Sequence, residues 1–396
     1  MSKENVYTIN ANADGGNYSK KVLIGESYGK FTNAFISADR SEVKATLENE
    51  SYVGRKKEDI YNSLFVSFKL KEDEPVEFMF DTRALGIEGS QYRANKEKCN
   101  DKQLVMNTLL SVAVMQLVNM DKSEYQKEMN FDINLSTGLP VKEWFTKGDK
   151  ETYAALFKGQ HIIEFKDRYI TQELGIEKIN LNVKDVDVQI EGIAALELVS
   201  DVESIEQDEI VNYANKEIVI IDIGQHTTDI AGAKYVYDRR DKSLSLETSR
   251  KLVDGINIGI GDVLEDIVEE IQKSKIVDRN EELTPEHILE AVMDFNGVLT
   301  SCGVNISSIY EKHMVSFANR IAEYFIRMCD EAGSRQRLNL ILLSGGGSNE
   351  HIIVRAFKEF IAKNEYNSEI VDIMNEYCEP VYANALGYDK MSKFNR

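Results

Sequence analysis

This chain has few of the cysteines that hold small domains together through disulfide bonds or zinc sites. Cysteine occurs four times in 396 residues, with no Cys-x-x-Cys pair and no adjacent histidines, which argues against a disulfide framework or a zinc site. We expect Cys99, Cys302, Cys329 and Cys378 to be free, buried thiols. Proline also occurs only four times and no low-complexity tract is present, so we expect no disordered linker or tail.

The chain has fewer basic than acidic residues, and it lacks long apolar runs. The chain has 47 basic and 67 acidic residues, a net charge of −20, which argues against direct binding of nucleic acid and favours a basic partner. The N-terminus lacks the apolar core of a signal peptide, and no stretch reaches the apolar length of a membrane span. We therefore expect a cytoplasmic protein without membrane contact, long enough for two large domains.

The most informative stretch runs from Ile218 to Asp229. It begins with four consecutive β-branched residues, which predict a strand buried on both faces of a sheet. The strand leads into glycine, hydroxyl and acidic residues, which bind phosphate and Mg²⁺ through backbone N–H groups, hydroxyl donors and carboxylate oxygens respectively. An ordinary hairpin is the alternative for this stretch taken alone. The candidate binding residues are Asp222, Gly224, Gln225, Thr227 and Thr228.

A second turn of the same kind lies near the N-terminus. After a short predicted strand from Val6 to Ile9, the segment from Asp14 to Lys21 reads DGGNYSKK, and another strand resumes directly after it. The polar residues are expected at a hairpin tip, where glycines bend the backbone and lysine supplies a positive charge for a phosphate. A solvent-facing glycine hairpin is the alternative. The candidate binding residues are Asp14, Gly15, Gly16, Asn17 and Lys21.

A third glycine turn follows a second buried strand, which is predicted from Leu338 to Leu343. Three successive glycines, from Gly345 to Gly347, separate this strand from a helix predicted to start near Asn349. Such glycines make a floor without side chains on which a base or ribose can lie, and we expect the helix amides to face phosphate. Another glycine run, GINIGIG from Gly255, lacks the GxGxxG spacing of a dinucleotide fingerprint.

One acidic residue stands where a predicted strand, Val183 to Ile190, meets a helix of small residues. This residue is Glu191. A carboxylate at such a junction can reach into a cleft and orient a water molecule for attack. By composition alone, Glu191 could equally be an acidic residue in the first helical turn that stabilises the helix N-terminus.

Other segments supply the frame around these turns. A helix is predicted from Asp101 to Met120, with an apolar face that packs against a sheet. A strand is predicted from Phe131 to Leu135, and the STGLP segment after it is expected to turn off the sheet. Region 31–100 shows no catalytic pattern and is expected to be a small peripheral insertion.

The acidic, weakly patterned segment 200–215 is the predicted boundary between the two halves. We expect a first domain over 1–212, which contains the insertion, and a second domain over 213–396. The last helix, about 380–396, is expected to pack back on the first domain.

The order of the motifs resembles that of the actin-like ATPase superfamily. DGGNYSKK from Asp14, Asp222 to Asp229, and SGGG from Ser344 are similar to its two phosphate motifs and its adenosine motif, and no Walker or protein-kinase motif is present. Within the superfamily, STGLPV, FKGQHII and YANALGY resemble the ParM/StbA and related Alp plasmid-segregation proteins. The resemblance covers nearly the whole chain.

This resemblance implies an α/β fold in which two related domains surround a central nucleotide cleft, with peripheral insertions. It implies that Asp14 and Asp222 face Mg²⁺ through water and that Lys21 faces the phosphates. Glu191 matches the family's water-positioning carboxylate, although the proline often found before it is Ile190 here. The implied catalytic residues are Glu191, Asp222 and Asp14, and the implied nucleotide-binding residues are Asp14, Gly15, Gly16, Asn17, Lys21, Gly224, Gln225, Thr227, Thr228, Gly345, Gly346 and Gly347.

The function implied is an ATP- or GTP-dependent filament former that segregates plasmid or phage-plasmid DNA. Nucleotide that bridges the two phosphate turns would favour closure of the halves, and hydrolysis would destabilise the polymer. The implied partners are further copies of the chain, head to tail, and a basic DNA-binding adaptor on a plasmid centromere. Direct contact with nucleic acid is not implied.

Two other functions fit the same phosphate turns. A small-molecule kinase of the sugar or acetate type shares this fold, but it needs a substrate-side catalytic acid that the sequence does not reveal. A scaffold that binds nucleotide without hydrolysing it is the other alternative. A heat-shock chaperone is disfavoured because little sequence follows Ala385 to form a peptide-binding domain.

Overall fold

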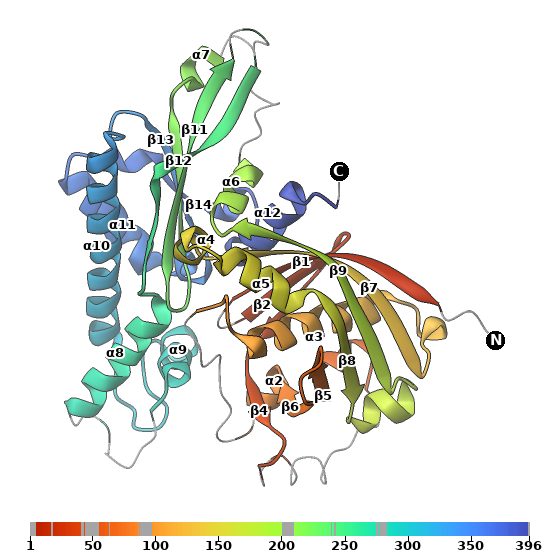
Figure 1. Ribbon diagram of the computed structural model, residues 1–396. Coiled ribbons are helices and arrows are strands. Elements are labelled where there is room, and N and C mark those ends of the chain that lie inside the picture. Colours follow the sequence, from red (N-terminus) through yellow and green to blue (C-terminus); the bar gives the residue numbers. More distant parts are fainter. Residues whose placement is uncertain are drawn as a thin grey trace. The chain divides into compact units, whose positions relative to one another are not determined.

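The computed structural model (Figure 1) describes residues 5–16, 19–40, 43, 55–62, 64–85, 87, 97–199, 210–238, 240, 243–274, 277 and 283–394. The chain divides into two compact units. The first comprises Met1–Ala195 and Asn384–Arg396, and the second comprises Leu196–Ala383. The sequence places the boundary after residue 212, within a segment whose residues 200–209 lie outside the described part, so the domain bounds stay a prediction.

Nine strands of the described chain form one mixed sheet in the first unit, in the order β3-β2-β1-β7-β9-β8-β5-β6-β4. The central strands β1, β7 and β9 are parallel neighbours, whereas β1 and β2 form an antiparallel hairpin. Their carboxyl ends therefore meet at one edge, where ligands bind in open α/β sheets. The strands are β1 (Val6–Gly15), β2 (Ser19–Ile24), β3 (Ser27–Thr32), β4 (Phe35–Ser37), β5 (Phe65–Leu70), β6 (Val76–Phe80), β7 (Glu128–Leu139), β8 (Gly159–Phe165) and β9 (Lys178–Ile190).

Helix α3 (Lys102–Asn119) covers one face of this sheet and forms its main core. Asp101 caps the helix, since its carboxylate accepts the amide of Leu104 at 2.9 Å. The predicted helix is confirmed, but it is buried on nearly all sides from Leu104 to Leu117 rather than on one apolar face. Further helical segments of this unit are α2 (Thr82–Leu85), α4 (Val141–Phe145), α5 (Asp149–Phe157), a π-helical turn (Tyr169–Glu173) and two 3-10 turns (Lys57–Asn62 and Lys122–Glu124).

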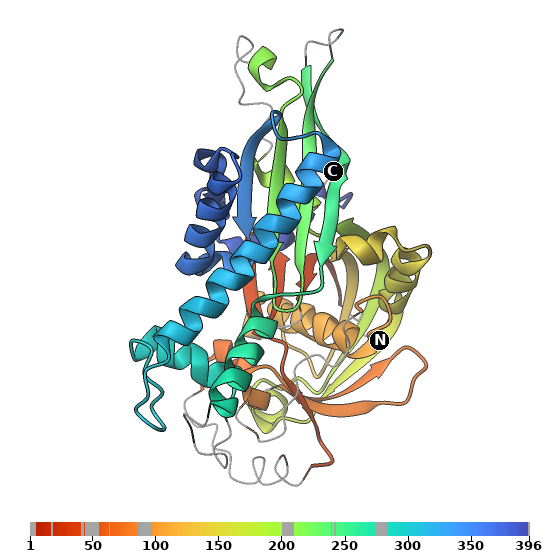
Figure 2. The same ribbon diagram turned by 90° about the vertical axis from the view of Figure 1, so that its left-hand side faces the viewer.

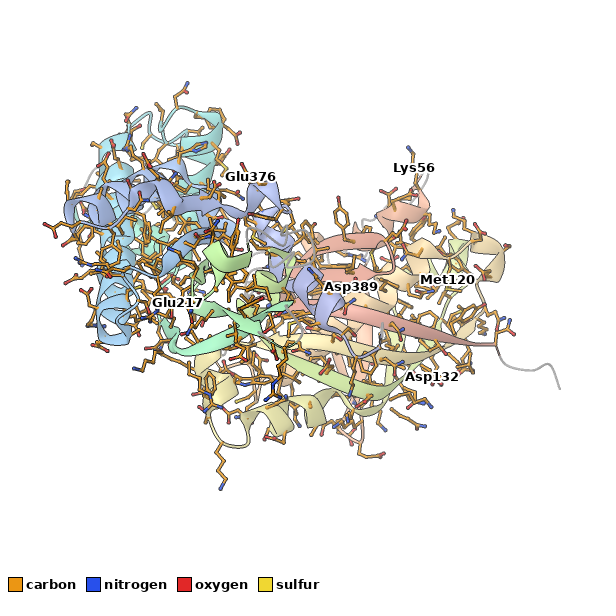
Figure 3. The ribbon with its side chains drawn as sticks, turned by 90° about the horizontal axis from the view of Figure 1, so that it is seen from above. Lys56, Met120, Asp132, Glu217, Glu376 and Asp389 are labelled. Atoms are coloured by element: carbon orange, nitrogen blue, oxygen red, sulfur yellow. The ribbon has the colours of Figure 1, made fainter. Side chains whose placement is uncertain are left out.

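The C-terminal helix α12 (Ala383–Met391) lies on the opposite face of the same sheet. Along β1, the side chain of Asn12 lies on the sheet face opposite to that of its core neighbours Ala11 and Ala13. Its amide donates to the carboxylate of Asp389 in α12 at 2.6 Å. Farther along, the hydroxyls of Ser136 and Ser392 are 2.9 Å apart. Figure 3 shows α12, with Asp389 labelled, over the strands on this side.

The described part of region 31–100 continues the sheet. Strand β5 pairs with β8 on one side and with β6 on the other, and β6 pairs with β4. A small separate core lies beside these strands and includes Ile36, Phe65 and Met79.

The second unit is built on five described strands in the order β12-β11-β10-β13-β14. Strand β10 is buried on both faces, as predicted from its β-branched residues, and it is parallel to β13 and antiparallel to β11. Figure 2 shows the long helix α10 across one face of this sheet. The strands are β10 (Glu217–Ile223), β11 (Thr228–Asp238), β12 (Ser243–Ile256), β13 (Leu338–Ser344) and β14 (Val371–Ile373), and the main helices are α7 (Ile210–Tyr213), α8 (Ile260–Lys273), α9 (Pro285–Asp294), α10 (Ser307–Ala332) and α11 (His351–Lys363). Helix α6 (Ile193–Val199) spans the boundary between the units.

Two expectations about the fold are wrong. Strand β7 continues through the STGL segment to Leu139, because Ser136 and Thr137 pair with β1 on one side and with β9 on the other. Cys302 is exposed, and Cys378 is only partly buried, whereas Cys99 and Cys329 are buried. All four thiols are free, as predicted.

The helices of the structure can be compared with the length and apolar character of a membrane span. Among the described helices, none combines the length and the apolar character needed to cross a membrane.

Candidate functional site

The first predicted phosphate turn lies at the end of the β1–β2 hairpin. Asp14 and Lys21 are opposite each other in the register, and Lys21 Nζ is 3.1 Å from Asp14 Oδ2. Burial would raise the pKa of Asp14, but the positive charges of Lys21, Lys98 and Lys20 lower it below its usual value. Asp14 is therefore an anion at neutral pH.

Side-chain hydrogen bonds hold the backbone of this turn in place. The carbonyl of Gly16 accepts Lys20 Nζ at 3.1 Å and Asn33 Nδ2 at 3.5 Å. Asn33 in turn accepts the amide of Asn107, a buried residue of α3, at 2.8 Å. Helix α3 thus fixes the position of the turn. Asn17, which the sequence also assigns to nucleotide binding, lies outside the described residues.

Glu191 lies immediately after β9 and is buried, with 6% of its surface exposed. Its carboxylate forms an ion pair with Lys98, whose side chain is equally buried. Burial lowers the pKa of Lys98, but the charges of Glu191 and Asp14 outweigh this and raise it above its usual value. Asp14, Lys98 and Glu191 therefore form one electrostatically linked group in the first unit.

Helix α12 orders the turn that carries Glu191. Gly192, with a φ of 79°, donates its N–H to the side-chain oxygen of Asn384 at 2.8 Å. A side chain on Gly387 would overlap the carbonyl of Ala194, and one on Gly138 would overlap the ring of Tyr388. The STGLPV and YANALGY segments noted in the sequence therefore pack in the same unit, next to Glu191.

Asn384→Ala tests this support. We expect the variant to lose about 1–3 kcal/mol of unfolding free energy, because the buried N–H of Gly192 loses its acceptor. Urea unfolding of the wild type and the variant measures this difference. Asn364→Ala is the matched control: Asn364 is exposed and donates to Phe360 at a helix end, so its loss is expected to stay within about 0.5 kcal/mol. Equal losses for the two variants would contradict a supporting role of Asn384.

The second predicted phosphate turn joins β10 to β11. Gly224 donates its N–H to the carbonyl of Thr227 at 2.9 Å, which closes the turn. Gly224, Gln225 and Thr227 are half-buried, whereas Thr228 is fully buried and its hydroxyl donates to the carbonyl of Ile258 at 2.9 Å. The hydroxyl of Thr228 thus has a structural partner, and Thr227 is the more accessible hydroxyl for a phosphate.

The backbone of the GINIGIG run forms hydrogen bonds with this second turn. Ile260 and Gly261 donate their N–H groups to the carbonyls of Gly224 and Gln225 at 3.0 and 2.8 Å. A Cβ at Gly259 would overlap Gln225, and one at Gly261 would overlap the side chain of the same residue. The glycines therefore allow the start of α8 to approach the turn closely.

Asp262, at the start of α8, links this segment to the turn. Its carboxylate accepts Gly259 N–H at 2.8 Å through Oδ2, and Oδ1 is 3.1 Å from Nδ1 of His226. His226 is thus held beside an acid at the helix start.

The third glycine turn packs against the carboxyl end of β10, at Asp222 and Ile223. Gly345 has φ 77° and ψ 176°, a conformation reserved for glycine, and a Cβ there would overlap Asp222 Oδ1. A Cβ on Gly347 would overlap Ile223, whereas Gly346 is exposed and a Cβ there would have open space around it. Gly345 and Gly347 are therefore packing positions, and Gly346 provides the open surface.

The helix after this turn starts at His351 rather than near Asn349, and an acidic side chain caps it. A 3-10 turn (Gly346–Asn349) intervenes, and Glu350 caps α11 by accepting Ile352 N–H at 3.2 Å. The hydroxyl of Tyr310 donates to the same carboxylate at 2.7 Å. The side chain of Glu350 places a negative charge at the helix N-terminus, which disfavours a second anion there.

A Mg²⁺ ion suits the donor types of these turns. Carboxylate oxygen is the protein ligand that Mg²⁺ prefers, and both Asp14 and Asp222 end a buried strand with a carboxylate at a glycine turn. Among the described residues, no group of three or more His, Cys, Asp or Glu side chains converges as a metal cage. The carboxylates of Asp14, in the first unit, and of Asp222, in the second, are therefore of the type that Mg²⁺ binds.

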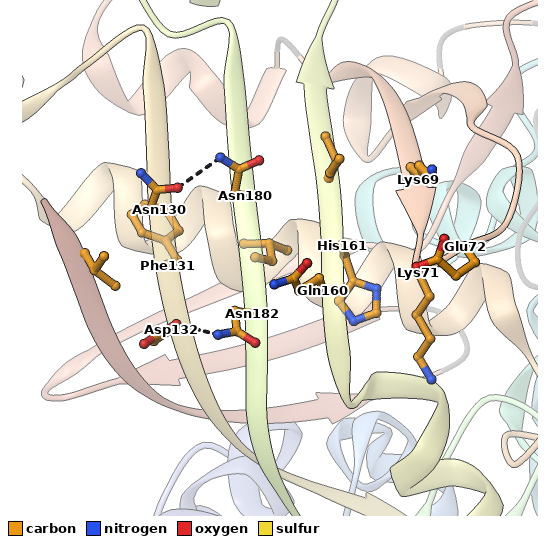
Figure 4. Close-up of a pocket in the computed structure, with 13 residues that line it drawn as sticks. Lys69, Lys71, Glu72, Asn130, Phe131, Asp132, Gln160, His161, Asn180 and Asn182 are labelled. Atoms are coloured by element: carbon orange, nitrogen blue, oxygen red, sulfur yellow. Dashed lines mark hydrogen bonds between the residues drawn. The ribbon is translucent and has the colours of Figure 1, made fainter. Parts of the chain in front are cut away.

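A pocket of about 450 Å³ lies elsewhere on the first unit. Figure 4 shows it on the polar face of the sheet, where Asn130 and Asn180, and Asp132 and Asn182, are joined by hydrogen bonds of 2.9 Å each. The described residues that line it include none of the predicted site residues. This pocket therefore does not belong to the candidate nucleotide site.

Sequence reasoning missed two parts of the site. Lys98 gave no signal, because it stands in a charged segment 93 residues before its partner Glu191. The glycines of the GINIGIG run directly precede a helix, which is a signal of a close approach between that helix and another backbone. Glycines that admit a helix to a turn have no fixed spacing.

Comparison with known proteins supports the fold. Residues 220–357 match the family described as archaeal actin homologue MreB-like, C-terminal. No curated protein sequence matches the chain.

Several solved structures resemble nearly the whole chain, including two ParM structures and Alp7A. A 15-stranded ParM filament from Clostridium botulinum is 16% identical, with 98% of this chain and 99% of that chain covered and a TM-score of 0.70. The actin-like protein Alp7A is 16% identical, with 98% of both chains covered and a TM-score of 0.65. ParM from Bacillus thuringiensis with ATP is 15% identical, with 98% of both chains covered and a TM-score of 0.59.

These likenesses confirm the resemblance at the level of fold. The alignment with the ParM filament covers 98% of this chain. The chain therefore has the actin-like fold, similar from end to end to ParM and Alp7A, and its second half matches the C-terminal part of the MreB-like archaeal actin homologues.

Proposed function

We propose that this protein is an actin-like nucleoside triphosphatase that assembles into filaments when ATP or GTP is bound and disassembles after hydrolysis. The observation that carries the proposal is the place of Glu191: a buried, charged carboxylate at the end of β9, in the same unit as the Asp14 phosphate turn. A scaffold that only binds nucleotide has no need for such a group. The fold shared with a ParM filament and with ParM bound to ATP supports the same function.

Each candidate residue has a role that its surroundings suit. Lys21 supplies positive charge to the phosphates beside Asp14. Gly15 and Gly16 offer backbone N–H donors at the first turn, and Thr227 offers a hydroxyl donor at the second. Gly224 forms the bend of the second turn, and Gln225 lines it. Gly346 gives the nucleoside a flat surface, which Gly345 and Gly347 make possible by packing closely against β10.

Glu191 acts as the acceptor that orients the attacking water. The ion pair with Lys98 holds this carboxylate in place at the end of β9. Bound Mg²⁺ would neutralise charge on the phosphates, and Asp14 and Asp222 would hold its water ligands.

DNA segregation is the biological use we propose for such a filament. The net charge of −20 favours a basic adaptor protein as the link to a plasmid centromere, and it disfavours direct binding of the filament to DNA. Head-to-tail contact between copies of the chain would generate the filament.

A pelleting assay with ATP, GTP, ADP and no nucleotide tests the proposal. We expect at least one triphosphate to drive the protein into the pellet, and ADP to do so far less. A protein that stays in the supernatant with both triphosphates, over a broad concentration range, would favour the small-molecule kinase. Nucleotide binding without phosphate release would instead favour the scaffold.

A further inference from the structure

The ion pair between Lys98 and Glu191 is the feature that the nucleotide-site motifs do not explain. Both side chains are almost completely buried, with exposed fractions of 5% and 7%. Burying two charges is costly, so such a pair is retained only where its geometry is well supported or where the charges are used. The charge of Lys98 also acts on Asp14 and helps to lower the pKa of that carboxyl.

The backbone of Lys98 is fixed independently of its side chain. The N–H groups of Lys98 and Cys99 donate to the two carboxylate oxygens of Glu143, at 3.0 and 2.8 Å. The carbonyl of Lys98 accepts the N–H of Asp101, the cap of α3, at 3.2 Å. Lys98 is therefore placed by α3 and α4 and reaches Glu191 from a rigid base.

From this geometry we infer that Lys98 is the positioning residue of Glu191: its ion pair fixes the carboxylate that orients the attacking water. The inference rests on the proposed function. A carboxylate has about four acceptor sites, so one ion pair leaves it able to accept a hydrogen bond from water. Two carboxylates and a polyphosphate in one site would repel each other, and Lys98 offsets that repulsion.

Lys98→Met tests the inference, because methionine keeps the length of the side chain and removes the charge. We expect kcat for phosphate release to fall about 10- to 100-fold, the range usual for residues that orient a reacting group. Binding of a fluorescent ADP analogue is expected to change little. Lys102→Met is the matched control, because Lys102 lies four residues away, 57% of its side chain is exposed, and its partner is the surface residue Asp73.

A double-mutant comparison separates positioning from general structural damage. If Lys98 acts through Glu191, then Lys98→Met is expected to lower kcat in the wild type but not in a Glu191→Gln background. Effects that multiply in the double variant would overturn the inference. A kcat for Lys98→Met that equals or exceeds that of the wild type would also overturn it.

Glu143→Gln keeps the test decisive if Lys98→Met fails to fold. This change leaves the charge of Lys98 and weakens only the support of its backbone, so we expect a smaller decrease in kcat that is again absent in the Glu191→Gln background. Unchanged kcat in Glu143→Gln would count against the inference. The wild type distinguishes failure of the proposed function from failure of the inference. If the wild type releases no phosphate from ATP or GTP, both the proposed function and the inference fail. If the wild type releases phosphate and Lys98→Met does so at the same rate, only the inference fails.

Discussion

Glu191→Gln is expected to form filaments that outlast those of the wild type. Glutamine keeps the shape of the side chain and an oxygen that can accept from Lys98, but it cannot accept a proton from water at neutral pH. We expect phosphate release to fall about 10²- to 10⁴-fold, the usual contribution of a positioned general base. Nucleotide binding and assembly are expected to remain. Light scattering and phosphate release, followed in parallel, measure both effects.

Glu177→Gln is the control for this variant. Glu177 is an exposed carboxylate of the same unit, 2.9 Å from Lys127, and its replacement is expected to leave assembly and hydrolysis unchanged. Unaltered phosphate release in Glu191→Gln would remove Glu191 from the mechanism. Loss of assembly together with a lower unfolding temperature would assign Glu191 a structural role instead.

Gly345→Ala and Gly346→Ala are expected to fail in different ways, although they are adjacent. The backbone of Gly345 lies where only glycine is common, and its new methyl group would overlap Asp222. We expect a loss of about 1–3 kcal/mol in unfolding free energy from the backbone conformation alone. Displacement of Asp222 is expected to weaken nucleotide binding as well. Urea unfolding and titration with ADP measure the two effects.

Gly346→Ala places its methyl group in open space on the surface proposed for the nucleoside. Stability is expected to change by no more than about 0.5 kcal/mol. Nucleotide affinity is expected to fall by roughly 10- to 200-fold, the usual cost of one misplaced methyl group in a pocket. Full affinity in Gly346→Ala would exclude this surface from the site, and full stability in Gly345→Ala would contradict the close packing against Asp222.

Local chemistry made much of this fold predictable. The β-branched run of β10 predicted a strand buried on both faces, and the apolar periodicity from Asp101 to Met120 predicted the helix α3. These features depend on near neighbours in the sequence, which is why a single sequence reveals them. The order of the glycine turns was enough to indicate an actin-like fold.

Long-range contacts account for what the sequence did not show. Serine, threonine and glycine after Leu135 are typical of a turn, yet β1 and β9 keep this segment in the sheet. Burial of Lys98 depends on Glu191 and Glu143, which are distant in the sequence. The cap of α11 by Glu350 and the hydrogen bond from Tyr310 to the same carboxylate likewise depend on packing between distant segments. Such effects require the register and packing of the folded chain.

One time course joins hydrolysis to assembly. Light scattering and phosphate release are recorded on the same sample of the wild-type protein after addition of a limiting amount of ATP or GTP with Mg²⁺. We predict that scattering rises first, that phosphate follows, and that scattering falls once the triphosphate is consumed. No rise in scattering with either triphosphate, or polymer that persists unchanged after complete hydrolysis, would contradict the proposed function.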